Sequence, residues 1–333
     1  MTVLVTGASG FVGSAITRAL IERGADVAVL VRESSNQENF ESLNVQIRTG
    51  DLRDKASLAR ACKGCNTLFH VAADYRLWTR DSRELYASNV DGTRNLMEIA
   101  LEAGIARIVY TSSVATLRCN TDGTSSDETS AVTINDMIGH YKRSKFLAER
   151  VVDELVETHN LPAVIVNPST PVGPRDVKPT PTGRLVRDAA AGKMPAYVDT
   201  GLNIAHVDDV AVGHILALER GTIGRRYILG GENLTLREIL NIIASVCGRS
   251  PPKIRLPRRL VYPIAYASQA WAWLSNGQEP QATVDGLRMA KKKMFFDSSR
   301  AIEELGYQSR PAEEALADAI AWFATHELPK SGR

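Results

Sequence analysis

The segment Thr6-Gly7-Ala8-Ser9-Gly10-Phe11-Val12-Gly13 joins a short apolar run at residues 2–6 to an amphipathic run at residues 11–24. The apolar run predicts a buried strand, and the amphipathic run predicts a helix. Glycine lets the backbone turn tightly and approach a phosphate, which the unpaired N–H groups at the helix start can bind. The order strand, glycine-rich turn, helix therefore predicts a dinucleotide site. Its candidate residues in this segment are Gly7, Ser9, Gly10, Phe11, Val12 and Gly13.

Strand and helix patterns continue to alternate along the first half of the chain. Further apolar runs predict strands at residues 27–31, 45–49, 67–72, 106–112 and 163–167. Amphipathic runs predict helices at residues 54–62, 83–103 and 137–158. Continuous Val, Ile and Leu runs are typical of parallel strands that are covered on both faces. We therefore predict an α/β fold with a Rossmann-like, doubly wound parallel sheet.

The sequence changes in character after residue 167. Five prolines fall within residues 168–181, which predicts an ordered, irregular loop that leaves a strand. Shorter patterns then predict helices at residues 208–220, 235–247 and 311–324 and a strand at 226–229. We predict a dinucleotide-binding domain over residues 1–167. Residues 168–333 are expected to form mainly a smaller substrate-binding lobe, from which some segments return to the first domain.

The composition excludes several classes of protein. Of 333 residues, 44% are hydrophobic and 23% are charged, which excludes a disordered or coiled-coil chain. The net charge of +2 provides no overall field that would attract nucleic acid. The 4 Cys and 6 His residues are too few and too scattered for a disulfide framework. Cys62 and Cys65 match the spacing C-x-x-C, but no second metal pair follows, so they are interpreted as small apolar side chains. The longest apolar stretch, residues 260–274, is too short to span a bilayer, and we expect a cytoplasmic protein.

Arg32 follows the second predicted strand, where ligands of this class of fold bind. An acidic residue at this position would accept hydrogen bonds from the ribose hydroxyls of NAD. A guanidinium group instead pairs with a 2′-phosphate, so Arg32 favours NADP(H) and leaves NAD(H) open.

Two further strand ends are expected to face the same cofactor. The carboxylate of Asp51 suits the adenine amino group, although a helix N-cap explains this residue nearly as well. Small residues after His70 leave room for a ribose and a pyrophosphate, while His70 itself is interpreted as a packed core histidine. The cofactor candidates at these two strand ends are Asp51, Leu52, Val71, Ala72 and Ala73.

Tyr141 and Lys145 stand four residues apart and therefore on one face of the predicted helix. A neighbouring ammonium group favours ionisation of a phenol, whose pKa in water is about 10. Tyr141 is therefore a candidate acid or base near neutral pH. Ser113, in Thr111-Ser112-Ser113, follows a predicted central strand at the sheet edge that carries the glycine-rich turn. Its hydroxyl group can hold a substrate oxygen beside Tyr141.

Together these motifs resemble the extended short-chain dehydrogenases/reductases from Thr2 to about Phe323. Further matching motifs are GDL at 50–52, HVAA at 70–73, NVDGT at 89–93, NPS at 167–169 and HVDDV at 206–210. Within the family, four segments resemble the bacterial hopanoid-associated sugar epimerases, a group similar to the dihydroflavonol 4-reductases. They are ADYRLW at 73–78, SSVATL at 112–117, GPRDVKPTPTGR at 173–184 and RMAKKKMFF at 288–296.

The resemblance implies a role for each matching residue. Ser113 would be catalytic and hydrogen-bond the reacting oxygen, and Tyr141 would donate or accept the proton. Lys145 would bind the nicotinamide ribose and lower the pKa of Tyr141. Asn167 and Pro168 would border the nicotinamide ring, and Ser113 and Asn167 would also contact the substrate.

Two other motifs are expected to be architectural. The resemblance implies that Asn89 supports the helix geometry beneath the site. Asp208 and Asp209 are explained by capping of the helix that follows them.

Three departures from the family's patterns bear on the reaction. Residues 114–115 are Val-Ala where dehydratases have an Asp-Glu pair, which argues against dehydration of a sugar nucleotide. Residues 201–205 hold no cation where nucleotide-sugar epimerases carry an arginine for the diphosphate. Arg32 favours a phosphorylated cofactor, whereas epimerases that oxidise and re-reduce one bound substrate generally hold NAD. Three cations of the proline-rich loop either replace the missing arginine or are solvated loop charges: Arg175, Lys178 and Arg184.

Residues 260–274 combine two tyrosines and two tryptophans, with three arginines just upstream. An apolar, aromatic helix beside basic residues can lie on an anionic membrane, at the inner membrane surface, or admit a lipid. We favour the alternative, in which this helix packs on the first domain and lines the pocket.

Three hypotheses about function follow. The leading one is an NADP(H)-dependent oxidoreductase that moves a hydride to or from a carbonyl or carbinol carbon. Its substrate would be a sugar or polyol attached to a hopanoid or related terpenoid, with Tyr75 and Trp78 as pocket walls. The second is an epimerase that uses the same residues with tightly held NAD, and the third is a non-catalytic dinucleotide sensor. For the enzymes, helices 83–103 and 137–158 are a candidate homodimer interface.

Overall fold

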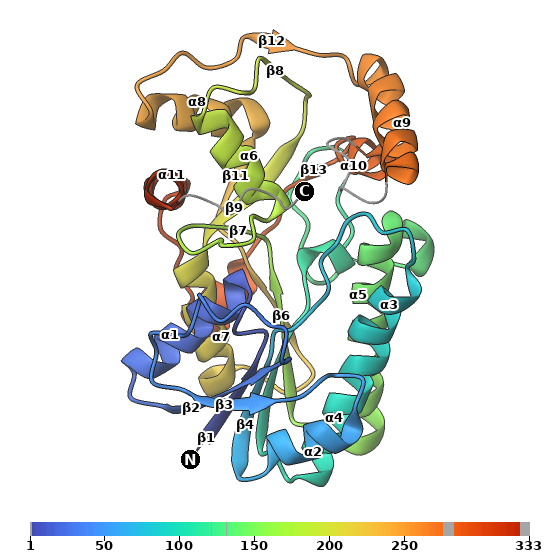
Figure 1. The fold of residues 1–333 in the computed structure, drawn as a ribbon, viewed down its shortest axis with the longest axis vertical. Coiled ribbons are helices and arrows are strands. Elements are labelled where there is room, and N and C mark those ends of the chain that lie inside the picture. The colour runs from blue at the N-terminus through green and yellow to red at the C-terminus, as the bar shows by residue number, and fades with distance from the viewer. Residues whose placement is uncertain (1, 121, 131, 276–282, 327–333) are drawn as a thin grey trace.

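Parallel strands form the main sheet of the computed structural model, which describes residues 2–120, 122–130, 132–275 and 283–326 (Figure 1). The strands lie in the order β10-β6-β5-β4-β1-β2-β3. Their bounds are β1 Thr2–Thr6, β2 Asp26–Val31, β3 Gln46–Thr49, β4 Cys65–His70, β5 Arg107–Thr111, β6 Ala163–Pro168 and β10 Arg226–Leu229. The α/β, Rossmann-like architecture predicted from the sequence is confirmed.

Helices cover both faces of this sheet because alternate residues of each strand point in opposite directions. Val3 and Val5 of β1 pack on one side, and Leu4 between them packs on the other. The first side is covered by α1 (Phe11–Glu22) and α7 (Val207–Arg220). The second side is covered by α2 (Lys55–Cys62), α4 (Gly92–Glu102) and α5 (Gly139–His159), and Figure 1 shows the two helical layers on either side of the strands.

The helix predicted at residues 83–103 is irregular near its centre. α3 (Arg83–Tyr86) passes through a π-helical turn at Ala87–Asp91 before α4 begins. Such turns are frequent at functional sites because they change the direction of a side chain within a helix. The helix predicted at residues 137–158 is observed as α5, whose bounds are Gly139–His159.

A second, smaller sheet carries the other lobe, which lies above the main sheet in Figure 1. It consists of β7 (Thr170–Val172), β9 (Gly201–His206), β11 (Glu232–Thr235) and β13 (Lys293–Met294). A separate apolar core joins it to α6 (Pro181–Ala190), α8 (Leu236–Val246) and α11 (Ala312–Thr325). The remaining elements are β8 Ala196–Tyr197, β12 Ile254–Arg255, α9 Arg258–Leu274, α10 Val284–Met289, 3-10 turns at Val114–Thr116 and Ile134–Asp136, and a π-helical turn at Ala301–Leu305.

The proline-rich segment is more regular than predicted. Residues 168–181 were expected to form an irregular loop, but they include strand β7 and the first residue of α6. Among the described strands, β7 pairs with β9 alone, and such an edge strand tolerates Pro171, which has no N–H to donate. Pro181 suits the first position of α6, where Thr180 accepts a hydrogen bond from the N–H of Gly183 at 3.0 Å.

The start of α7 differs from a second expectation, in which Asp208 and Asp209 cap this helix. The N-cap of α7 is His206, whose ring accepts a hydrogen bond from the N–H of Asp208 at 3.0 Å. Asp208 forms an ion pair with Arg175, and Asp209 forms one with Arg310 at 2.8 Å. Capping therefore does not explain the two aspartates, which instead tie α7 to distant segments.

Candidate active site

The glycine-rich turn between β1 and α1 forms a narrow cradle. Gly7 has a φ of +79°, and a Cβ at this residue would lie 2.7 Å from the backbone nitrogen of Ala72. A Cβ at Gly13 would lie 2.1 Å from the carbonyl oxygen of Gly7. Gly10 is the N-cap of α1, and no side chain caps this helix start. A backbone without side chains at the start of a helix fits the pyrophosphate of a dinucleotide.

Thr6 connects this turn to the neighbouring strand β4. Its hydroxyl oxygen accepts hydrogen bonds from the N–H groups of Val71 and Ala72, both at 3.1 Å, and lies 2.9 Å from Nδ1 of His70. Nε2 of His70 lies 3.0 Å from the hydroxyl of Thr93. Burial lowers the pKa of His70 to about 3, so the ring is neutral. His70 is the packed core residue that the sequence predicts.

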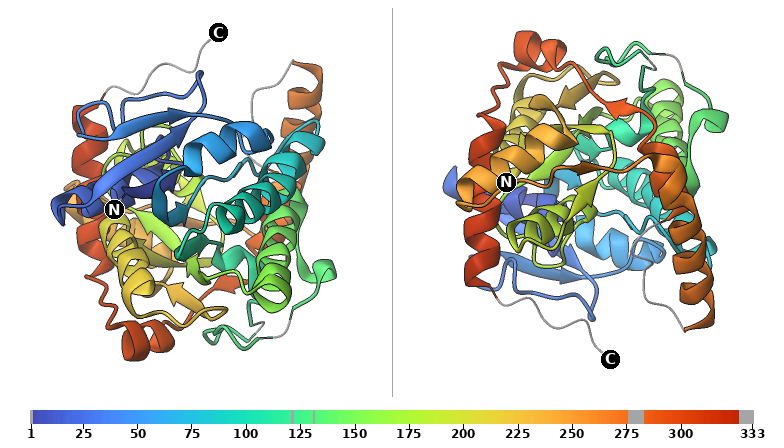
Figure 2. Two further views of the ribbon diagram at one scale, coloured as in Figure 1. Left: turned by 90° about the horizontal axis from the view of Figure 1, so that it is seen from below. Right: turned by 90° about the horizontal axis from the view of Figure 1, so that it is seen from above.

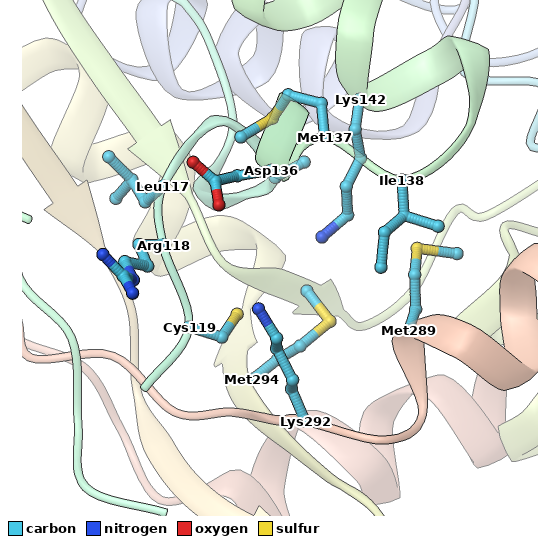
Figure 3. A pocket seen from close by; sticks show the side chains of 11 residues that line it. Leu117, Arg118, Cys119, Asp136, Met137, Ile138, Lys142, Met289, Lys292 and Met294 are labelled. Atoms are coloured by element: carbon cyan, nitrogen blue, oxygen red, sulfur yellow. The ribbon is translucent and has the colours of Figure 1, made fainter. Parts of the chain in front are cut away.

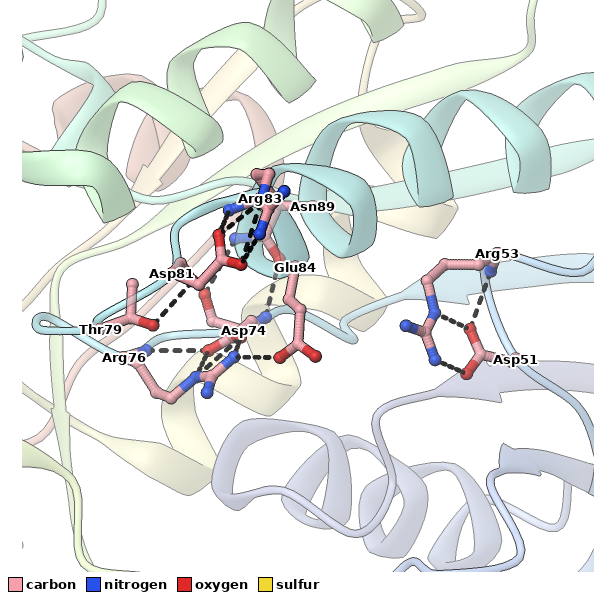
Figure 4. Close-up of polar contacts among 9 residues, drawn as sticks. All are labelled: Asp51, Arg53, Asp74, Arg76, Thr79, Asp81, Arg83, Glu84 and Asn89. Atoms are coloured by element: carbon pink, nitrogen blue, oxygen red, sulfur yellow. Dashed lines mark hydrogen bonds and ion pairs between the residues drawn. The ribbon is translucent and has the colours of Figure 1, made fainter. Parts of the chain in front are cut away.

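The two polar cofactor candidates lie at neighbouring strand ends. Arg32 is exposed directly after β2, where its backbone N–H donates to Ser35 Oγ at 3.0 Å. Asp51 accepts two hydrogen bonds from the Arg53 guanidinium at 2.9 and 2.8 Å (Figure 4), and these contacts lower the pKa of Asp51 to about 2. The N-cap of α2 is Asp54, so the capping alternative for Asp51 is wrong.

The other cofactor candidates line the same edge of the sheet. The backbone carbonyl oxygen of Ser9 accepts a hydrogen bond from the side-chain amide nitrogen of Asn39 at 3.2 Å. The remaining candidates are half-buried beside the apolar core or end a central strand. They are Phe11 and Val12 in α1, Leu52 before α2, Ala73 after β4 and Pro168 at the end of β6.

Asn89 in the π-helical turn fixes the loop that follows β4. Its side-chain oxygen accepts from the N–H of Asp74 at 2.7 Å, and its amide nitrogen donates to the carbonyl of Asp74 at 2.9 Å. The same nitrogen donates to Ser144 Oγ of α5 at 3.0 Å. Figure 4 shows Asn89 beside Asp74, whose carboxylate binds Arg76. The turn therefore holds the β4 loop against the helix that carries Tyr141.

Ser113 is positioned by the short turn that it starts. Its hydroxyl oxygen accepts a hydrogen bond from the N–H of Ala115 at 3.1 Å. Asn167, at the end of β6, donates to the carbonyl oxygen of Ser113 at 3.0 Å. Burial raises the pKa of Tyr141, while a hydrogen bond with Ser113 opposes this rise. The structure thus brings Ser113, Asn167 and Tyr141 together at the carboxyl edge of β5 and β6.

Lys145 is buried against the end of β5. Its ammonium group donates to the carbonyl oxygen of Thr111 at 2.8 Å and lies 5.0 Å from the ring centre of Tyr110. Burial lowers the pKa of Lys145 to about 8. Burial has the largest effect on the pKa of Tyr141 and raises it. A lowering of this pKa by Lys145 stays a prediction.

Glu149 forms a polar centre that sequence reasoning missed. One carboxylate oxygen accepts from Ser112, from Thr116 at 3.0 Å and from Asn167 at 3.1 Å. The other accepts from Arg226 of β10 at 2.9 Å. Although burial opposes ionisation, these contacts, led by the Arg226 charge, keep the pKa of Glu149 below its ordinary value. The only sequence signal is its spacing of one helical turn from Lys145.

A pocket of about 320 Å³ lies between the β4 loop and the start of α6. Its lining includes two of the four predicted substrate residues, Tyr75 and Trp78, together with Lys178 and Arg184 from the proline-rich segment. The other two, Ser113 and Asn167, are not among its lining residues. The hydroxyl of Tyr75 donates to the carbonyl oxygen of Lys178 at 3.2 Å and so connects the two walls. Arg175, the third cation considered, pairs with Asp208 instead. The other lining residues are Arg76, Thr79, Arg80, Pro179 and Pro181.

A smaller cavity lies beside the residue that follows Tyr141. Figure 3 shows the ammonium groups of Lys142 and Lys292 reaching into it, between methionine side chains and Cys119. Its volume of about 20 Å³ suits a water molecule better than a substrate. Cys62 and Cys65 are buried free thiols, and the described residues contain no group of three His, Cys, Asp or Glu side chains that could hold a metal ion.

Comparisons with known proteins agree with this architecture. The sequence profile of the NAD dependent epimerase/dehydratase family matches residues 3–230. A Synechocystis protein named "Putative dihydroflavonol 4-reductase" is 44% identical, over 98% of this chain and 96% of that protein. Sterol demethylase protein B of Methylococcus capsulatus is 35% identical, over 97% and 98%. The crystal structure of gox2253 is 53% identical with a TM-score of 0.88, over 99% of both chains.

The family is named for NAD-dependent epimerases and dehydratases, and the similar proteins include one named as a reductase. The match spans more than half of the chain, and both curated relatives align over almost their full length. The chain therefore belongs to the NAD-dependent epimerase/dehydratase family of extended short-chain dehydrogenases/reductases, and it is an NAD(P)-dependent oxidoreductase or epimerase.

Proposed function

We propose that this enzyme is an NADP(H)-dependent reductase or dehydrogenase that acts on a carbonyl or carbinol carbon. The observation that carries the proposal is the hydrogen-bonded pair of Ser113 and Tyr141, beside the glycine-rich cradle and the buried Lys145. A phenol and a hydroxyl group in this arrangement can hold one substrate oxygen between them.

The residues of the cradle fit a dinucleotide, which supplies or accepts the hydride when it is bound. The N–H groups at the start of α1 would hold its pyrophosphate, and Arg32 would hold a 2′-phosphate. Lys145 would donate to the ribose, and Asn167 and Pro168 would border the nicotinamide. Tyr141 would move the proton to or from the substrate oxygen, which Ser113 orients. The half-buried position of Tyr141 limits the access of water to this step.

We propose a substrate that has a hydroxylated end and a polycyclic apolar part. The aromatic walls formed by Tyr75 and Trp78 suit the apolar part, and the cations of Lys178 and Arg184 suit a sugar or polyol end with several oxygens. The relative named for sterol demethylation supports a polycyclic skeleton. A sugar or polyol attached to a hopanoid or related terpenoid combines both parts.

The first test is the replacement Tyr141→Phe. We expect NADPH affinity to stay within about twofold and turnover with carbonyl substrates to fall by about 10²–10⁴, because the proton donor is lost. The control is Tyr86→Phe, which removes a phenol that contacts His140 at 3.3 Å. A fully active Tyr141→Phe enzyme would refute the proposed mechanism.

The cofactor is tested separately by denaturing purified protein, identifying any released nucleotide and titrating the apoprotein with NADPH and NADH. We expect Arg32→Ala to weaken NADPH binding by about tenfold, as an ionic contact worth about 1.4 kcal/mol does, and to leave NADH binding unchanged. Arg23→Ala, which removes an exposed pair with Glu219, is the control.

The second candidate function is epimerisation, which the family profile supports. It uses the same hydroxyl groups, those of Ser113 and Tyr141. It also requires a cofactor that stays bound while the keto intermediate rotates in the site and the hydride returns. Tightly retained, stoichiometric NAD in the purified protein would favour this function over the reductase. Either enzyme is proposed to form a homodimer through α4 and α5, and sedimentation velocity tests this.

A further inference from the structure

α9 has an inner face that packs on the protein. Val261, Tyr262 and Ala265 form a small apolar cluster with Val284 and Leu287 of α10. Figure 1 shows α9 beside α10 at the upper right of the molecule, and both views of Figure 2 place it at the periphery. The inner side of the helix thus packs on the protein, and its other side is presented outward.

The outer face of α9 carries exposed apolar side chains between Leu260 and Trp271. Leu260, Ile264 and Trp271 follow one another at helical spacing and are exposed to 64%, 59% and 71%. Trp271 is the most exposed of the large apolar side chains in the described part of the chain. A contiguous stripe of this kind marks an interaction surface more often than single exposed residues do.

The surroundings of the stripe are basic. Residues 249–275 contain five Lys and Arg residues and no Asp or Glu. Lys253, Arg255 and Arg259 are exposed, next to the start of the stripe. In the described part of the chain, Arg255 forms an ion pair with Asp199, whose carboxylate lies 3.6 Å away. Positive charge beside exposed aromatic and aliphatic side chains complements a surface of anionic lipid headgroups.

The end of α9 is connected to the candidate substrate pocket. Arg80, which lines that pocket, donates hydrogen bonds to the carbonyl oxygens of Ala272 and Trp273. Its guanidinium group also lies 5.9 Å from the ring centre of Trp273. The wall of the pocket and the exposed stripe therefore meet at the carboxyl end of one helix.

We propose that α9 docks the enzyme on the surface of a bilayer that contains anionic lipids. Leu260, Ile264 and Trp271 insert at the boundary between headgroups and acyl chains, while Lys253 and Arg259 contact the headgroups. In the described residues, no helix is sufficiently long and apolar to cross a membrane, so α9 lies on the surface. Docking is independent of the proposed function. Docking would also place the pocket beside a lipid-linked substrate, and this second inference rests on the proposed function.

The test is flotation of the full chain with vesicles of phosphatidylcholine and phosphatidylglycerol, against phosphatidylcholine alone. We expect binding to the anionic vesicles, a blue shift of tryptophan emission and weaker binding as salt increases. The double variant Ile264→Ser/Trp271→Ser is expected to reduce the bound fraction at least tenfold. Lys253→Glu/Arg259→Glu is expected to abolish the preference for anionic lipid. Ile223→Ser/Ile302→Ser, at positions exposed to 47% and 54% on other elements, is the matched control.

Several results would overturn this proposal. They are failure of the full chain to bind anionic vesicles, an equal loss of binding in the control variant, and self-association that the α9 variant abolishes. The last would assign the stripe to a second copy of the chain. Turnover of a water-soluble carbonyl substrate is expected to be unchanged in the α9 variant. A failure of docking is therefore distinguishable from a failure of the proposed reaction.

Discussion

At the scale of single residues, the buried ammonium group of Lys145 predicts a pH limit for the reaction. Burial lowers the pKa of Lys145 to about 8, so the charged form is lost as pH rises through this value. If the charged form binds the cofactor ribose, kcat/KM falls above about pH 8. Arginine stays charged over this range. In Lys145→Arg, kcat/KM is therefore expected to show no fall above about pH 8 (the alkaline limb of the pH profile), although its value at every pH is expected to be lower. A limb at the same pH in the arginine variant would show that another group titrates.

Glu149 is predicted to be a positioning residue that sets the pH at which kcat/KM falls, through its effect on the pKa of Lys145. Its negative charge raises the pKa of Lys145 against the larger effect of burial. In Glu149→Gln that support is lost, so we expect the alkaline limb of kcat/KM to move to lower pH. The variant also leaves Arg226 without one partner at 2.9 Å, and a stability loss of about 3–5 kcal/mol is expected. The pH profile separates the two effects, because a purely structural role would leave the limb where it is.

The sequence identifies a reacting residue more readily than its supports. Ser113, Tyr141 and Lys145 could be chosen because strand ends and helical spacing predict where they lie. Glu149 could not be chosen, because its partner Arg226 lies 77 residues away and becomes a neighbour only when β10 joins β6. Its role follows from long-range packing, which no local pattern contains.

At the scale of elements, Asp176 predicts a pH-dependent start of α6. One carboxylate oxygen accepts from the N–H and hydroxyl of Thr180 at 2.9 and 2.8 Å, and burial raises the pKa of Asp176 to about 6. The folded state therefore holds this proton more tightly than the unfolded state. The resulting stability is complete below about pH 4 and is lost as pH rises through about 6.

The replacement Asp176→Asn tests this directly. We expect the free energy of unfolding of the variant, relative to the wild type, to increase between pH 4 and pH 8 by on the order of 3 kcal/mol. Urea denaturation across this range measures it. Asp188→Asn, which changes a half-exposed carboxylate paired with Arg187, is the control. A difference that does not change with pH would contradict the assigned proton.

The elements also show where sequence patterns lose information. The strands β1, β2, β5 and β6 were predictable because each is a mainly apolar run that is almost wholly buried, whereas the edge strand β3 is largely exposed. β7 was not, since Pro171 argues against a strand unless the strand is known to lie at an edge. The π-helical turn at Ala87–Asp91 was hidden within an otherwise regular helical pattern. Within this turn, the side chain of Asn89 binds Asp74 and Ser144, contacts that no local pattern contains.

At the scale of the whole molecule, the chain crosses between its two lobes several times. α7 and β10 follow the first segments of the smaller lobe but pack in the layers of the main sheet. Asp209 of α7 binds Arg310 shortly before α11, and Tyr227 of β10 donates to Glu304 at 2.9 Å. Tyr307 donates to the carbonyl oxygen of Gly230, also at 2.9 Å. The last part of the chain is thereby fastened to the main sheet.

This threading predicts how the molecule unfolds. Residues 1–167 alone would lack α7 and β10, which supply Val210, Ile215, Tyr227 and Leu229 to the core on the α1 side of the sheet. That face would then be exposed to water over much of its area, at a cost of about 25 cal/mol per Å² of apolar surface. We expect the full chain to unfold in urea in one cooperative transition and the fragment of residues 1–167 to show none, measured by near-UV circular dichroism. A fragment that unfolds cooperatively and binds NADPH would show instead that the first domain is independent, and that the crossings between the lobes only orient the substrate pocket.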